Sequence, residues 1–294
     1  MPPMSQSTTT TPQLEQVSAF WNANLCGSHF IDTEIYTEKF FEDYRELRYR
    51  KTHHLLSVID WEEARGKKLL EVGLGVGADA TMWARHGAIY TGIDLTEEAS
   101  FATNKHFDYL GLQGTIEQGN AESMRFEDNS FDMVYSHGVL HHSPSIEKTF
   151  AEIHRTLKPG GKFIVMLYAK GSFNYWVRIQ LWFRLKLIFT ILKSKFGIEP
   201  KAKLWKEHLA NFKSIGWSYL SWKNFPHRCT DGAGCEIANI YYKSEVKELL
   251  EKGGFKFKRS MKAHFPIGGK FPKFERLISK YLGFHLIAWA ENVK

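Results

Sequence analysis

Cysteine is scarce in this chain, which has only three cysteines in 294 residues. Cys26, Cys229 and Cys235 form an odd number, and none of them belongs to a Cys-x-x-Cys pair. Disulfide frameworks need paired cysteines and structural zinc sites usually draw on clustered ones, so neither is expected. We predict reduced thiols, a cytoplasmic protein and no bound metal.

Long uninterrupted hydrophobic runs are also missing. The longest apolar stretch, residues 175–192, contains Arg178, Arg184 and Lys186, and three charges make a bilayer-spanning helix costly. We favour a packed lid or dimer helix here, with a substrate-lining helix and a membrane-surface helix as alternatives. Residues 1–12 are rich in Ser, Thr and Pro without an apolar run, which predicts a disordered tail and not a signal peptide.

Charge is divided unevenly along the chain. Residues 1–170 hold 16 Lys and Arg against 23 Asp and Glu, whereas residues 171–294 hold 23 against 9. The first part is therefore at −7 and the second at +14. Such a split favours an anionic partner for the second part, either a substrate, a lipid surface or nucleic acid, unless the lysines only keep an aromatic surface soluble.

Apolar runs alternate with amphipathic stretches after Trp61, which predicts repeated βα units and a doubly wound, mostly parallel sheet of seven strands. The expected strands are residues 68–72, 88–93, 115–118, 131–136, 161–167, 255–265 and 285–291. The expected helices are residues 79–86, 99–110, 145–157 and 244–252. The predicted organisation is a tail (1–12), a helical cap (13–60), a core (61–170), an aromatic lid insertion (171–243) and the closing elements of the core (244–294).

The strongest motif lies at residues 69–79, where an apolar strand runs into a glycine turn that contains Gly73, Gly75 and Gly77. Glycines let the backbone approach a ligand closely at the carboxyl end of a strand. Glu71 inside this strand end would repel a dinucleotide's pyrophosphate but could receive an ammonium group. Asp94 ends the next strand about 20 residues later, in position for ribose hydroxyls. Together these features favour S-adenosylmethionine over a nicotinamide cofactor.

Four motifs in order give the chain a family resemblance: residues 69–79, 91–95, 119–142 and 157–162. It resembles the class I S-adenosylmethionine-dependent methyltransferases, in particular the small-molecule group that includes the ubiquinone and menaquinone C-methyltransferases. The resemblance implies S-adenosyl-L-methionine as cofactor, S-adenosyl-L-homocysteine as product and in-line displacement at a methyl group. The implied cofactor-binding residues are Glu71, Gly73, Gly75, Gly77, Asp94, Leu95, Asn120, Ala121, Glu122, Ser136 and His137.

Two neighbouring histidines, His141 and His142, are candidates for a general base, because a neutral imidazole can take a proton from an acceptor hydroxyl or amine. We slightly prefer His141, and a structural histidine pair is the alternative. Aromatic and polar residues of the cap and the insertion are predicted to bind the acceptor, although aromatics at this density also serve simple packing. These predicted substrate-binding residues are Trp21, Tyr49, Trp176, Trp182, Trp217 and Arg228.

The sequence therefore predicts methyl transfer from S-adenosylmethionine to a small hydrophobic metabolite at C, O or N. An anionic, isoprenoid-like or quinone-like acceptor would suit both the aromatic insertion and the excess of lysines. One alternative is a nucleic-acid methyltransferase, which the basic second part favours, although no Asn-Pro-Pro-aromatic motif is present. Another is a non-catalytic binding protein that uses the fold as a scaffold. Membrane contact is expected to be peripheral at most, and homo-oligomerisation stays open.

Overall fold

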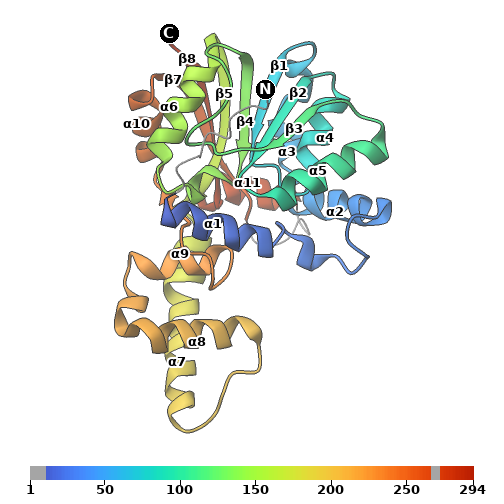
Figure 1. The fold of residues 1–294 in the computed structure, drawn as a ribbon. Helices are drawn as coiled ribbons and strands as arrows, with labels where there is room; N and C mark the ends of the chain where they lie inside the picture. Colours follow the sequence, from blue (N-terminus) through green and yellow to red (C-terminus); the bar gives the residue numbers. More distant parts are fainter. Residues whose placement is uncertain (1–10, 266–271) are drawn as a thin grey trace.

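A central sheet organises the computed structural model, which describes residues 11–265 and 272–294 (Figure 1). Its strands run in the order β3-β2-β1-β4-β5-β8-β7, with β6 paired to β5. β8 is antiparallel to both neighbours, and the other pairs are parallel. The strands are β1 (Lys68–Val72), β2 (Ile89–Asp94), β3 (Thr115–Gln118), β4 (Phe131–His137), β5 (Leu157–Ala169), β6 (Ile240–Tyr241), β7 (Phe255–Ala263) and β8 (His285–Asn292).

The predicted doubly wound, mostly parallel fold is thus confirmed, with eight strands in place of seven. The additional strand, β6, has only two residues, too few to show an alternating pattern in the sequence. β5 begins at Leu157, earlier than the predicted strand 161–167, and follows directly on helix α6, which ends at Thr156.

Helices cover both faces of the sheet and the edge where the parallel strands end (Figure 1). The helices that flank the sheet are α4 (Ala78–Arg85), α5 (Glu97–Leu110), α6 (Ile146–Thr156), α10 (Lys243–Lys252) and α11 (Pro272–Leu282). The N-terminal part contributes α1 (Pro12–Ala23), η1 (Ser28–Phe30), α2 (Glu38–Lys51), α3 (Leu55–Val58) and η2 (Trp61–Ala64). The tail expected for residues 1–12 lies outside the described residues, apart from Thr11 and Pro12. Helix α11 was not predicted from the sequence.

Local signals explain where the helices begin and end. Thr96 caps α5 by accepting a hydrogen bond from the amide of Ala99, and Gly111 ends the same helix with φ 61°. Ser145 caps α6 in the same way through the amide of Lys148. Such caps satisfy amide groups that have no partner inside the first helical turn, so these sequence positions fix the helix starts.

Two apolar cores lie on opposite faces of the sheet because successive strand residues point to opposite sides. On β4, Val134 belongs to one core, while Met133 and Tyr135 belong to the other. On β5, Phe163 and Val165 alternate with Ile164 in the same manner. Strands buried on both faces read as continuous apolar runs, which is why the sequence revealed them.

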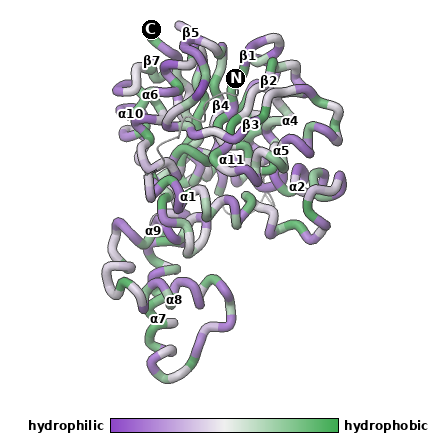
Figure 2. The backbone as a smooth tube through the Cα atoms, viewed as in Figure 1, coloured by the Kyte–Doolittle hydropathy of each residue, from purple (hydrophilic) through white to green (hydrophobic). Residues whose placement is uncertain are grey.

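Residues 174–230 form a separate projection, here called the lobe, which extends beyond the sheet from the side of α1 (Figures 1 and 2). The lobe consists of the π-helical η4 (Asn174–Phe183), α7 (Arg184–Lys195), α8 (Lys203–Ile215), η5 (Gly216–Leu220) and α9 (Asn224–Thr230). It has its own small core, centred on Ile179, Leu187, Trp205 and Tyr219. Among the described residues, no helix is both long and apolar enough to cross a membrane.

Candidate functional site

The glycine turn after β1 forms the floor of the candidate site. Gly73, Gly75 and Gly77 have φ values of 86°, 56° and 77°, a region that other residues rarely adopt. A Cβ atom at Gly73 would lie 2.2 Å from Cγ2 of Val139, so the turn is also too crowded there for a side chain. The sequence therefore needs glycine here both for backbone conformation and for space.

Glu71 is buried at the end of β1, where the hydroxyl of Tyr90 donates a hydrogen bond of 2.7 Å to its Oε2. Burial raises the pKa of the Glu71 carboxyl well above its usual value, and the nearby carboxylate of Asp79 adds to this. A cationic group bound next to Glu71 would stabilise its charged form. The position thus suits the ammonium group predicted from the sequence.

Asp94 ends β2 and shapes the loop around it. Its Oδ2 accepts a hydrogen bond of 2.8 Å from the amide of Leu74, while its Oδ1 accepts two from the amide and hydroxyl of Thr96 at 2.9 and 2.7 Å. These contacts hold the carboxylate against the glycine turn. Carboxylate oxygens can accept more than one hydrogen bond each, so Asp94 still has capacity for ribose hydroxyls.

Asp79 in the first turn of α4 joins three polar side chains in a buried network. Arg48 donates to both of its carboxylate oxygens, at 3.2 Å from Nε and 2.6 Å from Nη2. The hydroxyls of Tyr49 and Tyr135 donate to it at 3.1 and 2.9 Å. Burial by itself would raise the pKa of Asp79, but the Arg48 guanidinium lowers it to about 2. Asp79 was not predicted as a site residue, although an acid two residues after the last glycine of the turn was its signal.

Arg48 also connects this network to β4, because its Nη2 lies 3.0 Å from Nδ1 of His137. A guanidinium can only donate, so Nδ1 of His137 carries the lone pair and the ring proton sits on Nε2. Ser136, the preceding residue, points elsewhere and donates to the carbonyl of Val72 at 2.8 Å. His137 lines the cavity described below, and Ser136 does not.

Residues 120–122 also line the cavity. The side chain of Asn120 accepts a hydrogen bond of 2.9 Å from the amide of Glu122. Glu122 in turn accepts from the hydroxyl of Ser143 at 2.6 Å and from the amide of Ser145 at 2.9 Å. Glu122 therefore fixes the loop before α6, and Ala121 lines the cavity.

These groups share one cavity, which contains about 1110 Å³ of space between atoms and is partly open to solvent. Its walls come from the carboxyl ends of β1, β2 and β4, the place where doubly wound sheets bind ligands. Helix α1 closes the cavity from outside with Leu14, Val17 and Trp21. The predicted site residues on its wall are Glu71, Gly73, Gly75, Asp94, Leu95, Asn120, Ala121, Glu122, His137, His142 and Trp21.

His142 and His141 have different surroundings in the short helix η3 (Leu140–His142). His142 lines the cavity, and its Nδ1 lies 2.6 Å from the carbonyl oxygen of Ile237, which places the ring proton on Nδ1 and the lone pair on Nε2. That Nε2 lies 3.7 Å from Oδ2 of Asp231. The hydroxyl of Tyr168 donates to the other oxygen of Asp231 at 2.9 Å.

His141 is fully buried and does not line the cavity. Its ring packs against Tyr168, with 3.9 Å between ring centroids, and neither ring nitrogen has a hydrogen-bond partner among the described residues. Burial, and then the neighbouring His142, hold the pKa of His141 well below its usual value. Its surroundings are those of a packed, neutral imidazole.

Four of the predicted substrate-binding residues lie on the lobe, away from the cavity wall. Trp176, Trp182 and Trp217 are exposed on its surface, and Arg228 pairs with Glu236 at 3.2 Å. Tyr49 is held in the Asp79 network, and only Trp21 lies on the wall. A substrate role for all six residues, Trp21 included, stays a prediction.

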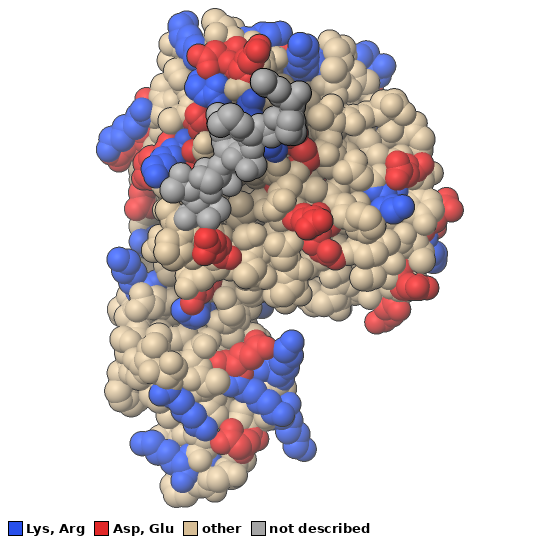
Figure 3. All heavy atoms as spheres, in the orientation of Figure 1, with Lys and Arg blue, Asp and Glu red and all other residues tan. Residues whose placement is uncertain are grey.

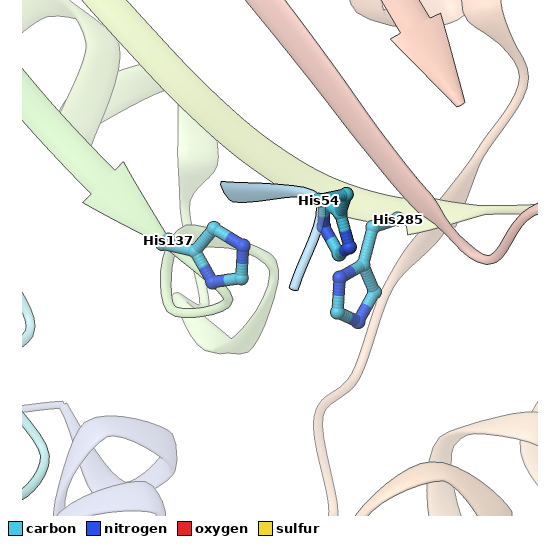
Figure 4. A group of neighbouring side chains, drawn as sticks. All are labelled: His54, His137 and His285. Carbon is cyan, nitrogen blue, oxygen red and sulfur yellow. The ribbon is translucent and has the colours of Figure 1, made fainter. Parts of the chain in front are cut away.

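Two groups of side chains have the composition of metal sites. His54, His137 and His285 face one another next to the cavity (Figure 4), and His141, His142 and Asp231 form the second group. In each group, one potential ligand atom from every residue lies within 4.8 Å of the others. Imidazole suits zinc, iron, copper and nickel.

The tautomer of His137 weighs against a metal in the first group. Its Nε2 carries the proton as long as Arg48 donates to Nδ1, so ligation through Nε2 would require Arg48 to withdraw. We therefore describe His54, His137 and His285 as a buried cluster of neutral imidazoles. The expectation that the protein holds no metal stays a prediction.

Comparison with protein-family models matches residues 70–165 to the methyltransferase domain. The matched segment contains the glycine turn, Glu71, Asp94 and the histidine pair. The chain carries a class I S-adenosylmethionine-dependent methyltransferase domain. The predicted family, the fold and S-adenosylmethionine as the cofactor of this domain are confirmed.

Curated relatives of this methyltransferase domain act on different acceptors. Phosphoethanolamine N-methyltransferase 2 of Caenorhabditis elegans is 34% identical over 108 residues, which are 36% of this chain and 25% of the relative. The 24-methylenesterol C-methyltransferase 2 of Arabidopsis thaliana is 39% identical over 102 residues, 34% of this chain and 28% of the relative. The chain thus aligns with about a quarter of the length of these relatives.

A solved structure, a SAM-dependent methyltransferase from Methanosarcina mazei, superposes with a TM-score of 0.51 and 19% identity. The superposition covers 77% of this chain and 92% of that one. It extends the similarity in fold well beyond the matched methyltransferase domain.

Proposed function

We propose that the protein transfers a methyl group from S-adenosylmethionine to a small, lipid-like acceptor that has a hydroxyl or amine nucleophile. The observation that carries this proposal is that Glu71, Asp94 and His142 line a single cavity. Glu71 suits the methionine end of the cofactor and Asp94 its ribose. His142 suits a base that takes a proton from the acceptor. Nucleic-acid methylation and a non-catalytic scaffold find no support in the comparisons.

The cofactor supplies the activated methyl group, and three side chains have suitable chemistry to hold it. Asp94 would accept hydrogen bonds from the ribose hydroxyls, and Glu71 would receive the methionine ammonium. Arg48 lines the cavity too, and its Nη1 has no hydrogen-bond partner among the described residues, so it can meet the methionine carboxylate. The backbone near Asn120 borders the space left for adenine.

His142 is the base in this proposal. The lone pair on its Nε2 can accept the proton that leaves the acceptor as the new bond to the methyl carbon forms. The resulting imidazolium would be stabilised by the Asp231 carboxylate, which lies 3.7 Å away and is itself oriented by Tyr168. Asp231 and Tyr168 act here as positioning residues.

Apolar side chains around the entrance favour a hydrophobic acceptor. Leu14, Val17 and Trp21 of α1, together with Leu25, present an apolar wall near His142, and the edge of the Trp21 ring system contacts His142 at 5.0 Å between centroids. The sterol-methylating relative supports a lipid-like acceptor, and the free thiols Cys26, Cys229 and Cys235 fit the cytoplasmic location that we propose.

The test is methyl transfer from S-adenosylmethionine labelled in its methyl group to a panel of sterols, prenylated quinols and phosphoethanolamine. We expect label in the lipid extract. His142→Ala should lower kcat by about 100-fold or more, the usual contribution of a general base, while the affinity for S-adenosylmethionine stays unchanged. Asp231→Asn should lower kcat less and shift its pH profile.

His141→Phe is the matched control, because it replaces a buried ring by one of similar size. It should keep most of the activity if His142 is the base. A His142→Ala variant that retains full activity, or a His141→Phe variant that loses it while remaining folded, would contradict this assignment.

A further inference from the structure

The lobe exposes an unusual amount of apolar surface. It holds half of the large hydrophobic side chains that are exposed among the described residues, although it is about a fifth of the chain. Phe196 is 84% exposed, Trp217 69% and Phe189 64%. Monomeric soluble proteins rarely show apolar patches of this kind without a partner. The exposed apolar residues of the lobe are Trp176, Val177, Leu181, Trp182, Leu185, Phe189, Leu192, Phe196, Ile198, Ile215, Trp217 and Trp222.

Several of these side chains form a continuous stripe along one helical face. Leu181, Leu185, Phe189, Leu192 and Phe196 recur at intervals of three or four residues from the end of η4 to the end of α7. This spacing places them on one side of the helix. The opposite side of the same helix packs into the lobe core through Leu187 and Ile191. The helix is therefore apolar on both sides, and one side has no partner within the described chain.

The lobe that carries this stripe is rich in basic side chains (Figure 3). Residues 174–230 contain eleven Lys and Arg but only two acids, Glu199 and Glu207, so the lobe is at +9. Among the described residues, those two acids pair only with Lys213 and Lys203, which leaves the other lysines without a carboxylate. Lys186 and Lys193 instead lie over aromatic rings, at 4.7 and 6.0 Å from the centroids of Trp205 and Phe189.

We propose that the lobe docks on the surface of a membrane that contains anionic lipids. Trp and Phe beside Lys and Arg are the combination that holds amphipathic helices at the boundary of headgroups and acyl chains, and each nearby basic residue adds attraction to anionic lipid. A second copy of the chain fits this face poorly, because two surfaces at +9 would repel each other. Nothing in the docking requires a helix that crosses the membrane.

The base of the lobe contacts residues of the cavity wall. Asp231 follows α9 directly and lies 3.7 Å from Nε2 of His142, which lines the cavity. The ring of Phe20 in α1 approaches Gly234 so closely that a Cβ atom there would lie 3.2 Å from its Cε2. Docking through the lobe would therefore hold α1 and the cavity entrance near the membrane. The benefit of this position rests on the proposed function: near the membrane, the cavity could take up a lipid-like acceptor from the bilayer.

The test is sedimentation of the full chain with two kinds of vesicle, neutral phosphatidylcholine and a mixture with phosphatidylglycerol. We expect strong binding to the mixed vesicles and weak binding to the neutral ones. Lys186→Glu combined with Lys193→Glu should weaken binding to mixed vesicles by about tenfold or more. Trp182→Ser combined with Phe189→Ser should do the same, because both side chains are exposed and their loss leaves the lobe core intact.

Lys247→Glu combined with Lys252→Glu on α10 is the matched control, with the same change in charge far from the lobe. It should bind vesicles like the unchanged protein. No binding to mixed vesicles, or equal loss in the control, would overturn the proposal. A concentration-dependent dimer that the Trp182 and Phe189 variant abolishes would instead assign this face to a second copy. Vesicle binding needs neither cofactor nor acceptor, so its outcome is independent of the proposed reaction.

Discussion

Asp94→Ala is expected to weaken binding of S-adenosylmethionine by about 100-fold or more. The proposed contacts of Asp94 are charge-assisted hydrogen bonds to two ribose hydroxyls, each contributing about 1.5 to 3 kcal/mol, and about 1.4 kcal/mol corresponds to a tenfold change in affinity. The variant also removes the acceptor for the amides of Leu74 and Thr96, which shape the loop. Calorimetric titration with S-adenosylmethionine measures the loss.

Asp132→Ala separates loss of the ligand contact from general damage to the fold. Asp132 also accepts a hydrogen bond from a backbone amide, that of Lys68 at 2.9 Å, and pairs with Lys158 at 2.6 Å. It lies near the beginnings of β1 and β4, at the opposite edge of the sheet. This variant should lose some stability and keep its affinity. Affinities of both variants within threefold of the unchanged protein would contradict the role of Asp94.

The second large effect is destabilisation by acid. Burial lowers the pKa of His54 to about 3, with His264 and His53 adding to the effect, and it holds the pKa values of His137 and His285 well below normal. In the unfolded chain these groups titrate near pH 6.5. Below that pH the unfolded state therefore binds more protons than the folded state, and stability falls.

Each of the three histidines should reduce the free energy of unfolding by about 1 kcal/mol between pH 7 and pH 5.5. Their sum is a large part of the few kcal/mol that stabilise an ordinary domain. Glu71 acts in the opposite direction, because its raised pKa lets the folded state take up one proton. Because three histidines lower the stability on acidification and one glutamate raises it, the protein should lose stability overall as the pH falls.

Urea unfolding at pH 7.5, 6.5 and 5.5 measures this effect. His54→Gln removes one of the three titrating rings, so its stability should depend less steeply on pH than that of the unchanged protein. A free energy of unfolding that stays constant from pH 7.5 to pH 5.5 would show that the histidine cluster is not neutral in the folded state.

The sequence predicted the sheet well because its signals are local. Buried strands such as β1 and β4 are continuous apolar runs, and the glycine turn after Glu71 depends on conformations that neighbouring residues fix. Asp94 was predicted for the same reason, because it ends the strand that follows the glycine motif about 20 residues later along the chain. These features need no knowledge of distant parts of the chain.

The network around Asp79 could not be predicted in the same way. Arg48, Asp79 and His137 are about 30 and 58 positions apart, and only the packing of α2 against α4 and β4 brings them together. Asp231 likewise reaches His142 across 89 positions of the chain. Long-range polar contacts leave no periodic trace in the sequence.

The insertion also differs from what its composition suggested. Its aromatic residues were expected to roof the cavity, whereas the structure places α1 over the cavity and Trp176, Trp182 and Trp217 on the surface of the lobe. A hydrophobic side chain is more stable in an apolar environment than in water. It does not say whether protein or membrane provides that environment.

The central claim is that this cavity binds S-adenosylmethionine, and calorimetric titration of the unchanged protein tests it most directly. We expect micromolar binding of S-adenosylmethionine and S-adenosylhomocysteine and no binding of NAD, because Glu71 would repel a pyrophosphate and attract an ammonium group. Absence of binding by both adenosyl ligands, or equal binding of NAD, would contradict the account.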